Sequence, residues 1–428
     1  MQKVVFPSED TKVILLLCGV LGKESNVQPL TQSEYTSLVR SLIMLEMRPC
    51  DMLNSNRIPE IAEYSKLDTQ RLDALLSRGV QLGFAAEEWD RNGIWVISRS
   101  EADYPGHLKK HLKDKAPPLL FCIGNPNLLT GGGIAIVGSR NVDKQGELFA
   151  RQVARQCAMD GMPVVSGGAR GVDQIAMNAS MEVGGITIGV IADNLLKKSL
   201  ERKARKAISS GNLLLLSPYH PKAGFKVGTA MARNKLIYAM ADYAVVVSAE
   251  AGQGGTWAGA REELKRENSR PVFVRTGENI PSGNSKLLEL GAMKWPELNE
   301  PEHINQQLSE LAKKRKSRRK AEQQNLFDFA DPGITVTQQV RETDNPYSTN
   351  TKTRQRNETD NIPPSVYQAV LPVILAKLST PKSSAELAEQ LDVTKAQLNK
   401  WLAIAVADKA IRKLSRPVRY ALTKDNDS

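Results

Sequence analysis

The sequence predicts an α/β protein whose core is a doubly wound parallel sheet. Six short apolar runs alternate with helical patterns in the middle of the chain. A buried parallel strand is apolar on both faces, so this alternation favours a parallel sheet with helices on both sides. The expected strands are 134–137, 163–166, 186–191, 213–216, 244–247 and 272–274, and the expected helices are 146–160, 173–183, 199–210, 234–241 and 256–267.

Residues 1–90 predict a separate helical module in front of the core, which we place at residues 91–300. The apolar run 13–21 is too short to span a bilayer and is expected to be a buried first element. Thr31 and Glu34 form a capping-box pattern that opens a helix over 31–47. Shorter helices are expected at 58–64 and 68–82, and Gly83 is expected to end the last of them.

Two further segments follow the core. Residues 301–364 predict a basic, largely disordered linker, because they hold the cationic run 313–320 and then polar sequence with few apolar anchors. Residues 365–424 predict a winged helix-turn-helix, with helices at 366–378, 383–391 and 394–405 and a hairpin of 410–414 with 418–422. Its third helix would expose Lys395, Gln397 and Lys400, which suits contact with DNA or docking to a protein equally.

Composition indicates the class of partner and the compartment. The 428 residues carry a net charge of +11, which favours a polyanion, and nucleic acid before a membrane surface. Four scattered cysteines without a CxxC pair argue against zinc and against disulfides, as expected in the cytoplasm. The first glycine turn is not GxGxxG, so no dinucleotide or other cofactor is expected.

The candidate binding residues follow the strands or open the helices of the predicted sheet. Ligands of such sheets bind beyond the carboxyl ends of the strands, where helix N-termini offer free N–H groups. Four short stretches there combine glycines, hydroxyls and cations, which predicts one cationic, phosphate-binding cleft. They are Gly138, Ser139 and Arg140; Ser166, Gly167, Gly168, Arg170 and Gly171; Arg233, Asn234 and Lys235 at the start of a helix; and Gly254, Gly255 and Thr256. Asp173 is expected to cap the helix after the second stretch.

These motifs resemble, in order and spacing, the bacterial DNA-processing protein A (DprA/Smf) family. The matching segments are GSR at 138–140, SGGARGVD at 166–173, RNK at 233–235 and the GGT loop, preceded by DYP at 103–105 and PPLLFCIGN at 117–125. The resemblance covers roughly residues 95–295 and departs from the family pattern at 176–177, 230–232, 235 and 254–260.

The resemblance implies a Rossmann-like core that binds single-stranded DNA in DNA processing and recombination. It further implies protection of that strand and loading of a RecA-type recombinase, notably during natural transformation. We also expect a homodimer. Bases would need aromatic platforms, for which Tyr219, Phe225, Tyr238 and Trp257 are candidates.

An enzymatic alternative comes from the wider fold family, which includes nucleoside-monophosphate phosphoribohydrolases. Those enzymes carry an arginine similar to Arg233 and a glycine loop similar to 252–256, followed by two catalytic glutamates. Here Ala258 and Gly259 stand at the glutamate positions, and Glu262 and Glu263 lie a turn further along. Without a carboxylate to stabilise an oxocarbenium ion, this chemistry is not expected, and we assign no catalytic and no metal-binding residues.

A short motif in the predicted linker suggests a protein partner. Gln323, Leu326 and Phe327 resemble the QxxLF peptides that dock on the bacterial sliding clamp. The alternative is that Leu326, Phe327 and Phe329 pack back onto the core. An isolated Leu-Phe pair in a polar segment requires an apolar pocket in either case.

Overall fold

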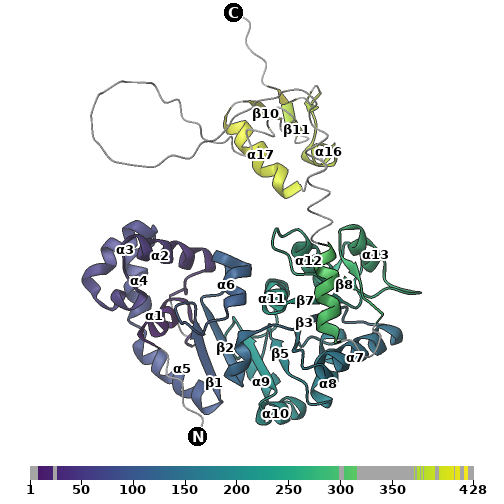
Figure 1. The fold of residues 1–428 in the computed structure, drawn as a ribbon. Coiled ribbons are helices and arrows are strands. Elements are labelled where there is room, and N and C mark those ends of the chain that lie inside the picture. Colours follow the sequence, from purple (N-terminus) through teal and green to yellow (C-terminus); the bar gives the residue numbers. More distant parts are fainter. Residues whose placement is uncertain are drawn as a thin grey trace, which may run out of the picture. The chain divides into compact units, whose positions relative to one another are not determined.

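The computed structural model describes residues 8–22, 27–297, 303–315, 371, 374–375, 377–378, 380–390, 395–408, 410–414 and 419–422. The chain divides into two compact units, Met1–Ile334 and Thr335–Ser428. The first unit holds a large sheet with helices on both faces, and the second holds short helices and a hairpin (Figure 1).

The first unit is built on one nine-stranded sheet with the order β1-β2-β6-β5-β4-β3-β7-β8-β9. The strands from β6 to β9 are parallel to one another, whereas β2 is antiparallel to both β1 and β6. Their bounds are β1 Ile94–Ser98, β2 Leu119–Gly124, β3 Ile134–Val137, β4 Val164–Ser166, β5 Thr187–Val190, β6 Leu213–Ser217, β7 Tyr243–Val246, β8 Val272–Val274 and β9 Met293–Lys294. The six predicted strands correspond to β3–β8, so the parallel core is confirmed.

Alternate residues of these strands pack against opposite layers of helices. On one face, Ile134 and Val245 contact α7 (Lys144–Met159), α8 (Val172–Glu182) and a helix over 304–315. On the other, Ala135 and Val246 contact α6 (Gly106–Leu112), α11 (Val227–Met240), α12 (Gly254–Leu264) and α13 (Ser282–Glu289). The sheet is therefore doubly wound (Figure 1).

Two helix boundaries differ from the sequence expectation. Helix α11 begins at Val227, seven residues before the expected start, because the chain turns earlier, at Pro221 and Lys222. The segment 199–210, predicted as one helix, belongs to α9 (Leu195–Ser199) and α10 (Arg202–Ser209). The 3₁₀ turns η3 (Lys113–Lys115) and η4 (Pro126–Thr130) flank β2.

The helix over 304–315 lies where the sequence predicted the start of the linker. Ile304 and Leu308 are buried one helical turn apart in the core cluster that contains Phe273. An i, i+4 apolar pair is too short a pattern to stand out from the surrounding polar sequence. The QxxLF-like residues Gln323, Leu326 and Phe327 lie outside the described residues.

The N-terminal helices pack around their own core and against the β1–β2 edge. They are α1 Glu9–Cys18, α2 Gln32–Met44, η1 Pro49–Leu53, η2 Ser55–Arg57, α3 Ile58–Ser65, α4 Thr69–Leu76 and α5 Gly79–Arg91. The capping box of Thr31 and Glu34 is present at the start of α2, as predicted. The prediction that Gly83 ends a helix is wrong, because α5 runs through it. Burial of Leu82, Ala85 and Trp89 outweighs a glycine cost of about 1 kcal/mol.

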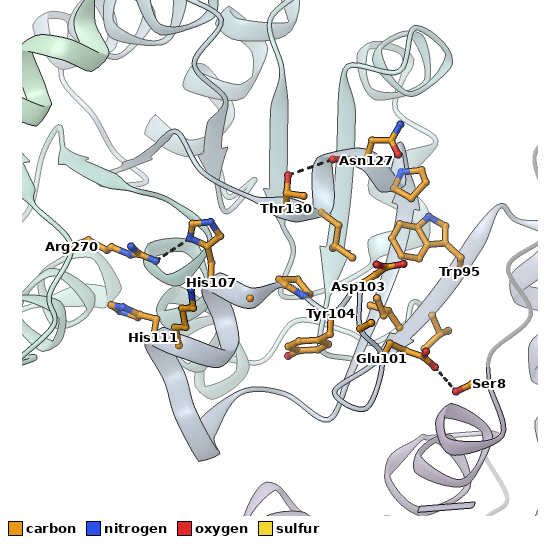
Figure 2. A pocket seen from close by; sticks show the side chains of 18 of the residues that line it. Ser8, Trp95, Glu101, Asp103, Tyr104, His107, His111, Asn127, Thr130 and Arg270 are labelled. Atoms are coloured by element: carbon orange, nitrogen blue, oxygen red, sulfur yellow. Dashed lines mark hydrogen bonds between the residues drawn. The ribbon is translucent and has the colours of Figure 1, made fainter. Parts of the chain in front are cut away.

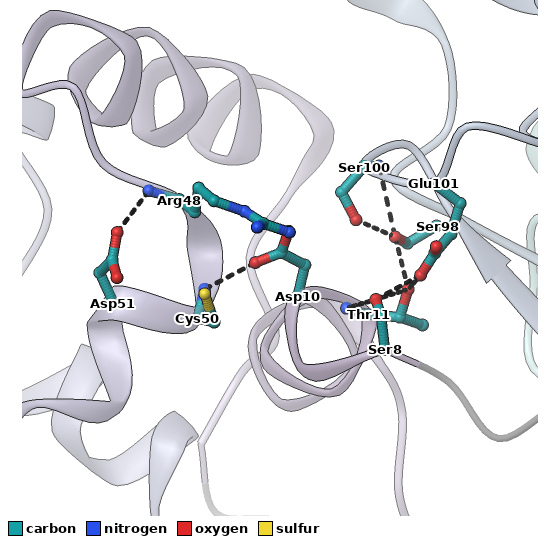
Figure 3. A network of polar contacts seen from close by, with 9 residues as sticks. All are labelled: Ser8, Asp10, Thr11, Arg48, Cys50, Asp51, Ser98, Ser100 and Glu101. Carbon is teal, nitrogen blue, oxygen red and sulfur yellow. Dashed lines mark hydrogen bonds and ion pairs between the residues drawn. The ribbon is translucent and has the colours of Figure 1, made fainter.

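A buried carboxylate ties η1 to α1 (Figure 3). Arg48 Nη2 lies 2.6 Å from Asp10 Oδ2, and the Cys50 N–H donates to Asp10 Oδ1 at 2.9 Å. Burial raises the pKa of Asp10, but these hydrogen bonds outweigh it and leave the pKa below its usual value. The carboxylate is thus held ionised at the start of α1.

The second unit contains α16 (Ser384–Gln390), α17 (Lys395–Ala407) and the hairpin of β10 (Ile411–Leu414) with β11 (Arg419–Leu422). Leu387, Leu398, Leu402 and Ile411 form its core. These elements agree with the expected positions of two helices and two strands, while the winged-helix assignment itself remains a prediction. Among the described residues of the whole chain, no helix is both long and apolar enough to cross a bilayer.

A side chain in place of Gly133 should destabilise the start of β3. Its φ is +81°, and a Cβ there would lie 2.1 Å from the carbonyl oxygen of Pro163. Gly93 also has a positive φ, of +65°, but open space around it. We expect Gly133→Ala to lower the free energy of unfolding by about 1–3 kcal/mol more than Gly93→Ala, because only the first substitution adds a steric clash. Urea denaturation of both variants measures the difference, and equal losses would contradict it.

Candidate functional site

The candidate site lies where the direction of chain progression across the sheet reverses. From β3 the chain progresses to β4, β5 and β6 on one side, and then returns to add β7 on the other side of β3. The loops after β3 and β7 consequently lead to helices on opposite faces, α7 and α12. A crevice opens between two such loops, and this is the usual ligand position in open α/β sheets.

A cavity of about 540 Å³ occupies this crevice. Eight of the predicted site residues line it: Gly138, Ser139, Arg140, Arg233, Asn234, Gly254, Gly255 and Thr256. The other six predicted residues of the core are not among its lining residues: Ser166, Gly167, Gly168, Arg170, Gly171 and Lys235. The structure therefore brings together the first, third and fourth predicted stretches.

Hydrogen bonds between the two loops use groups that the sequence suggested for a ligand. The Ser139 N–H donates to the Ser248 carbonyl at 3.0 Å and lies 3.1 Å from Ser248 Oγ. Thr256 Oγ1 donates to the Gly138 carbonyl at 2.9 Å. A Cβ on Gly138 would lie 2.5 Å from Val172, so only glycine permits this close packing. These contacts fix the shape of the crevice.

Arg140 and Phe225 form one rim of the cavity. The guanidinium carbon of Arg140 lies 5.0 Å from the centroid of the Phe225 ring, a cation–π contact. Arg140 is exposed, and Phe225 is 48% exposed. Val227 and Met231, which line the cavity beside Phe225, are exposed as well. The rim thus presents a cation beside an apolar surface.

Arg233 is buried at the cavity wall, with only 4% of its surface exposed. It lies in the second turn of α11 and not at the helix start, as the sequence had suggested. Its Nη1 is 3.9 Å from Asp173 Oδ2, and neither Nε nor Nη1 has a hydrogen-bond partner among the described residues. A Cβ on Gly167 would lie 1.5 Å from Nη1, so the guanidinium occupies the space that this glycine leaves.

The Asp173 carboxylate accepts hydrogen bonds from backbone N–H groups that the sequence suggested for a phosphate. Burial raises its pKa to about 6, although Arg233 and the backbone N–H groups of Gly138, Gly167 and Ala169 favour the ionised form. The N-cap of α8 is Gly171, so Asp173 lies in the first turn and does not cap the helix as predicted. Sequence reasoning missed its role because only the fold brings Arg233 to it.

The remaining predicted residues support the crevice or lie outside it. Ser166 is buried and donates to the Ile136 carbonyl, while Arg170 is exposed and donates to Asn141 Oδ1 at 2.6 Å. Gly171, with φ +87°, packs under the loop after β3, where a Cβ would lie 2.4 Å from the Ser139 carbonyl oxygen. Lys235 faces a smaller cavity between α11 and α12, 3.5 Å from Glu262. Of the four cations among the predicted site residues, Arg140 and Arg233 line the crevice, whereas Arg170 and Lys235 do not.

The glutamates of α12 point away from the crevice. Glu263 is buried against His111 at 2.8 Å and accepts from the Arg270 N–H, and Glu262 pairs with Arg266 at 3.1 Å. Both line the smaller cavity. Asp173 and Glu250 are the carboxylates among the residues that line the crevice. The arrangement is suited to binding an anion with an attached apolar group.

Comparison with known proteins agrees with this architecture. The family model for the DNA recombination-mediator protein A matches residues 95–308. The DNA processing protein DprA of Bacillus subtilis is 30% identical over 208 residues, which cover 47% of this chain and 67% of that protein. The DNA processing protein DprA of Streptococcus pneumoniae is 33% identical over 183 residues, covering 41% and 63%. The X-ray structure of DprA from Streptococcus pneumoniae has the same fold, with a TM-score of 0.54 at 24% identity over 68% of this chain and 95% of that one.

Asp173 should make stability depend on pH in a defined window. Its folded pKa of about 6 lies above the value of about 4 for an unfolded Asp. Its contribution is therefore fully present below pH ~4 and is lost as the pH rises through ~6. Asp173→Asn cannot titrate at this position. The difference in unfolding free energy, unmodified protein minus variant, should therefore decrease as the pH rises from 4 to 7. Urea midpoints across this range measure it. Asp103→Asn, at an exposed site, is the control, and a constant difference for Asp173→Asn would refute the assignment.

Proposed function

The chain belongs to the DNA recombination-mediator protein A family, and on this premise we propose that it binds single-stranded DNA in DNA processing and recombination. The observation that carries the proposal is the buried Arg233, whose Nε and Nη1 lack hydrogen-bond partners in the part of the chain that the structure describes and which lies beside a cavity of about 540 Å³. Buried polar groups without partners are rare and require an explanation. A phosphate oxygen that approaches through the cavity is the partner we propose.

The local charge at the Arg140 rim favours an anion. The crevice is lined by two cations, Arg140 and Arg233, and by two carboxylates, Asp173 and Glu250. Arg233 and Asp173 lie 3.9 Å apart and nearly cancel each other, so the positive charge offered to a ligand is that of the exposed Arg140. A phosphate near both arginines would exchange solvent counterions for fixed cations, which makes binding sensitive to salt. Gly254 and Gly255 open α12 at the opposite wall and add the N-terminal end of its dipole.

The apolar rim favours a single strand over a duplex. Phe225, Val227 and Met231 present apolar surface next to Arg140. Bases in a duplex stack on each other and hide their faces, whereas those of a single strand can stack on a side chain. We therefore propose that a phosphate lies at Arg140 and Arg233 while a neighbouring base covers Phe225. Tyr238, another candidate platform, is 2% exposed and is proposed as part of the wall.

We further propose that the site has no catalytic activity. Cleavage of a nucleoside monophosphate requires a carboxylate beside the sugar. The α12 glutamates face the other cavity, and Asp173 is held by Arg233 and backbone N–H groups. Glu250, the other carboxylate that lines the crevice, is exposed to solvent. Incubation with each nucleoside monophosphate should release no base, and turnover above that of Asp173→Asn would contradict the proposal.

The proposals about partners other than DNA are based on the sequence alone. A RecA-type recombinase is proposed from the family resemblance, and a cytoplasmic location from the four scattered cysteines. Homodimerisation is also proposed. Docking on a sliding clamp is proposed from Gln323, Leu326 and Phe327. A pull-down with purified clamp should be abolished by Leu326→Ala with Phe327→Ala, and an unchanged pull-down would exclude the motif.

Titrations of oligonucleotides across salt concentrations test the DNA site. We expect Phe225→Ala to weaken single-strand binding by about 1–3 kcal/mol, the usual range for one stacked base. Arg140→Ala should lower the slope of log affinity against log salt by about 0.7, as expected for one phosphate contact. Fluorescence anisotropy with single- and double-stranded oligonucleotides measures both.

Arg91→Ala is the matched control for this test. It removes one positive charge at an ion pair with Glu87 on α5, outside the crevice. It should leave single-strand binding nearly unchanged. Equal affinity for duplex, or equal effects of Arg140→Ala and Arg91→Ala, would rule out the single-strand site at this crevice.

A further inference from the structure

A second and larger cavity, of about 1210 Å³, lies at the β1 edge of the sheet (Figure 2). Its walls come from β1, from the loop and helix over 101–111, from η4 and from the segment before β8. It shares no lining residue with the crevice at Arg140 and Arg233. Its volume exceeds the roughly 300–1,000 Å³ typical of small-molecule sites, which indicates room for a segment of chain.

The first relevant feature is a free strand edge. β1 is the terminal strand of the sheet and pairs only with β2 among the described strands. In this register Arg99 bonds to Pro118, so the odd-numbered residues of β1 face β2. The N–H and C=O groups of Ile94 and Val96 therefore point outward, and no described group forms a hydrogen bond with them.

Val96 shows that this edge faces the cavity. Its side chain packs with Leu15 and Trp89 on the opposite face of the sheet, yet Val96 also lines the cavity. The N–H and C=O groups of Val96 point away from β2 on the strand that borders the cavity. One donor and one acceptor of the sheet edge are thus available beside the cavity.

Apolar side chains form the floor beside this edge. Trp95 and Ile97 alternate with Val96 and pack with the cluster that contains Tyr104 and Leu129. The Trp95 Nε1–H donates to the Gly124 carbonyl at 3.3 Å, which fixes the indole ring. Figure 2 shows Trp95 and Tyr104 along this floor. A strand added to β1 would place every second side chain against it.

One end of the cavity is cationic. Arg270 Nη2 donates to His107 Nδ1 at 3.2 Å (Figure 2). Arg270 Nε is buried and has no hydrogen-bond partner within the described ranges. Since arginine can only donate, His107 accepts at Nδ1 and carries its proton on Nε2. Lys110 is exposed and forms no ion pair with any described residue. These three groups offer donors to a carboxylate.

The other end is anionic. Glu101 accepts hydrogen bonds from Ser8 and Thr11, and Thr11 Oγ1 lies 2.8 Å from Ser98 Oγ (Figure 3). This network fixes the turn after β1 to the start of α1. Asp103, on the same turn, is exposed and has no ion-pair partner among the described residues. It is available to a cation.

We propose that this cavity binds an extended peptide segment of a protein partner, which adds to β1 as a further strand. The main chain of the segment pairs with Val96, alternate apolar side chains cover Trp95 and Ile97, an acidic group meets Arg270 and Lys110, and a basic group meets Asp103. The two unlike charges at the ends set the direction of the segment. This surface is independent of the DNA crevice, so failure of either proposal leaves the other intact.

Selection from a phage-displayed library of random heptapeptides tests the proposal with the full-length chain. We expect sequences with alternating apolar residues, an acidic residue towards one end and a basic residue towards the other. The double variant Lys110→Ala, Asp103→Asn should lose this enrichment at least tenfold. Both residues are exposed, so folding is preserved. Lys115→Ala, which removes a charge outside the cavity, should retain it. Equal enrichment by the double variant, or no common pattern, would overturn the proposal.

The selected consensus peptide then separates strand addition from other modes of binding. In an extended peptide, the N–H groups of every second residue face β1. Two N-methylated series are therefore made, one methylated at the odd positions and one at the even positions, and one of them removes the donors that face β1. One N-methylated series should lose at least tenfold in affinity, and the other should bind almost unchanged. Equal affinities of the two series would overturn strand addition. Displacement of the peptide by ADP at a lower concentration than by unlabelled peptide would assign the cavity to nucleotides instead.

Discussion

The buried contact between Arg233 and Asp173 is the constraint on which the candidate DNA site depends. Three segments meet there: the loop after β3, the loop after β4 and the middle of α11. A guanidinium and a carboxylate are both costly to bury, and each reduces the cost of the other. Removing either would leave an uncompensated charge beneath the crevice. The close approach of the three segments is therefore tied to this pair.

Glycine makes that close approach sterically feasible. Gly138 lies against Val172, Gly167 against the Arg233 guanidinium, and Gly171 under the carbonyl of Ser139. A Cβ at any one of these three glycines would clash with that neighbour and prevent the close approach. Gly167 and Gly171 thus serve the site without lining it. The glycine-rich loops, interpreted from the sequence as a phosphate cradle, use much of their freedom to pack against one another.

The sheet separates two surfaces with different chemistry. At its centre, the loop after β3 carries Arg140 and helix α11 carries Arg233, and both lie beside apolar side chains of the crevice proposed to hold nucleic acid. At its edge, β1 offers free main-chain groups between a cationic and an anionic end, which suits a peptide. The two surfaces share no lining residue, so the proposed DNA site and the proposed peptide site do not compete for side chains.

The sequence by itself determined the six central strands, their helices and the capping box at Thr31, because apolar periodicity and capping chemistry are local properties. It also located the stretches that line the crevice at Arg140 and Thr256, since these follow a strand or open a helix, and it identified Arg233 although it placed that residue at the start of α11 and not in its second turn. It did not reveal that Asp173 would accept hydrogen bonds from backbone N–H groups suggested for a phosphate, that Lys235 would face Glu262, or that β1 would be a free edge. Those facts depend on which distant segments become neighbours. Only tertiary packing decides that, because burial of Arg233 and the register of β1 on β2 arise from contacts between residues far apart in the chain.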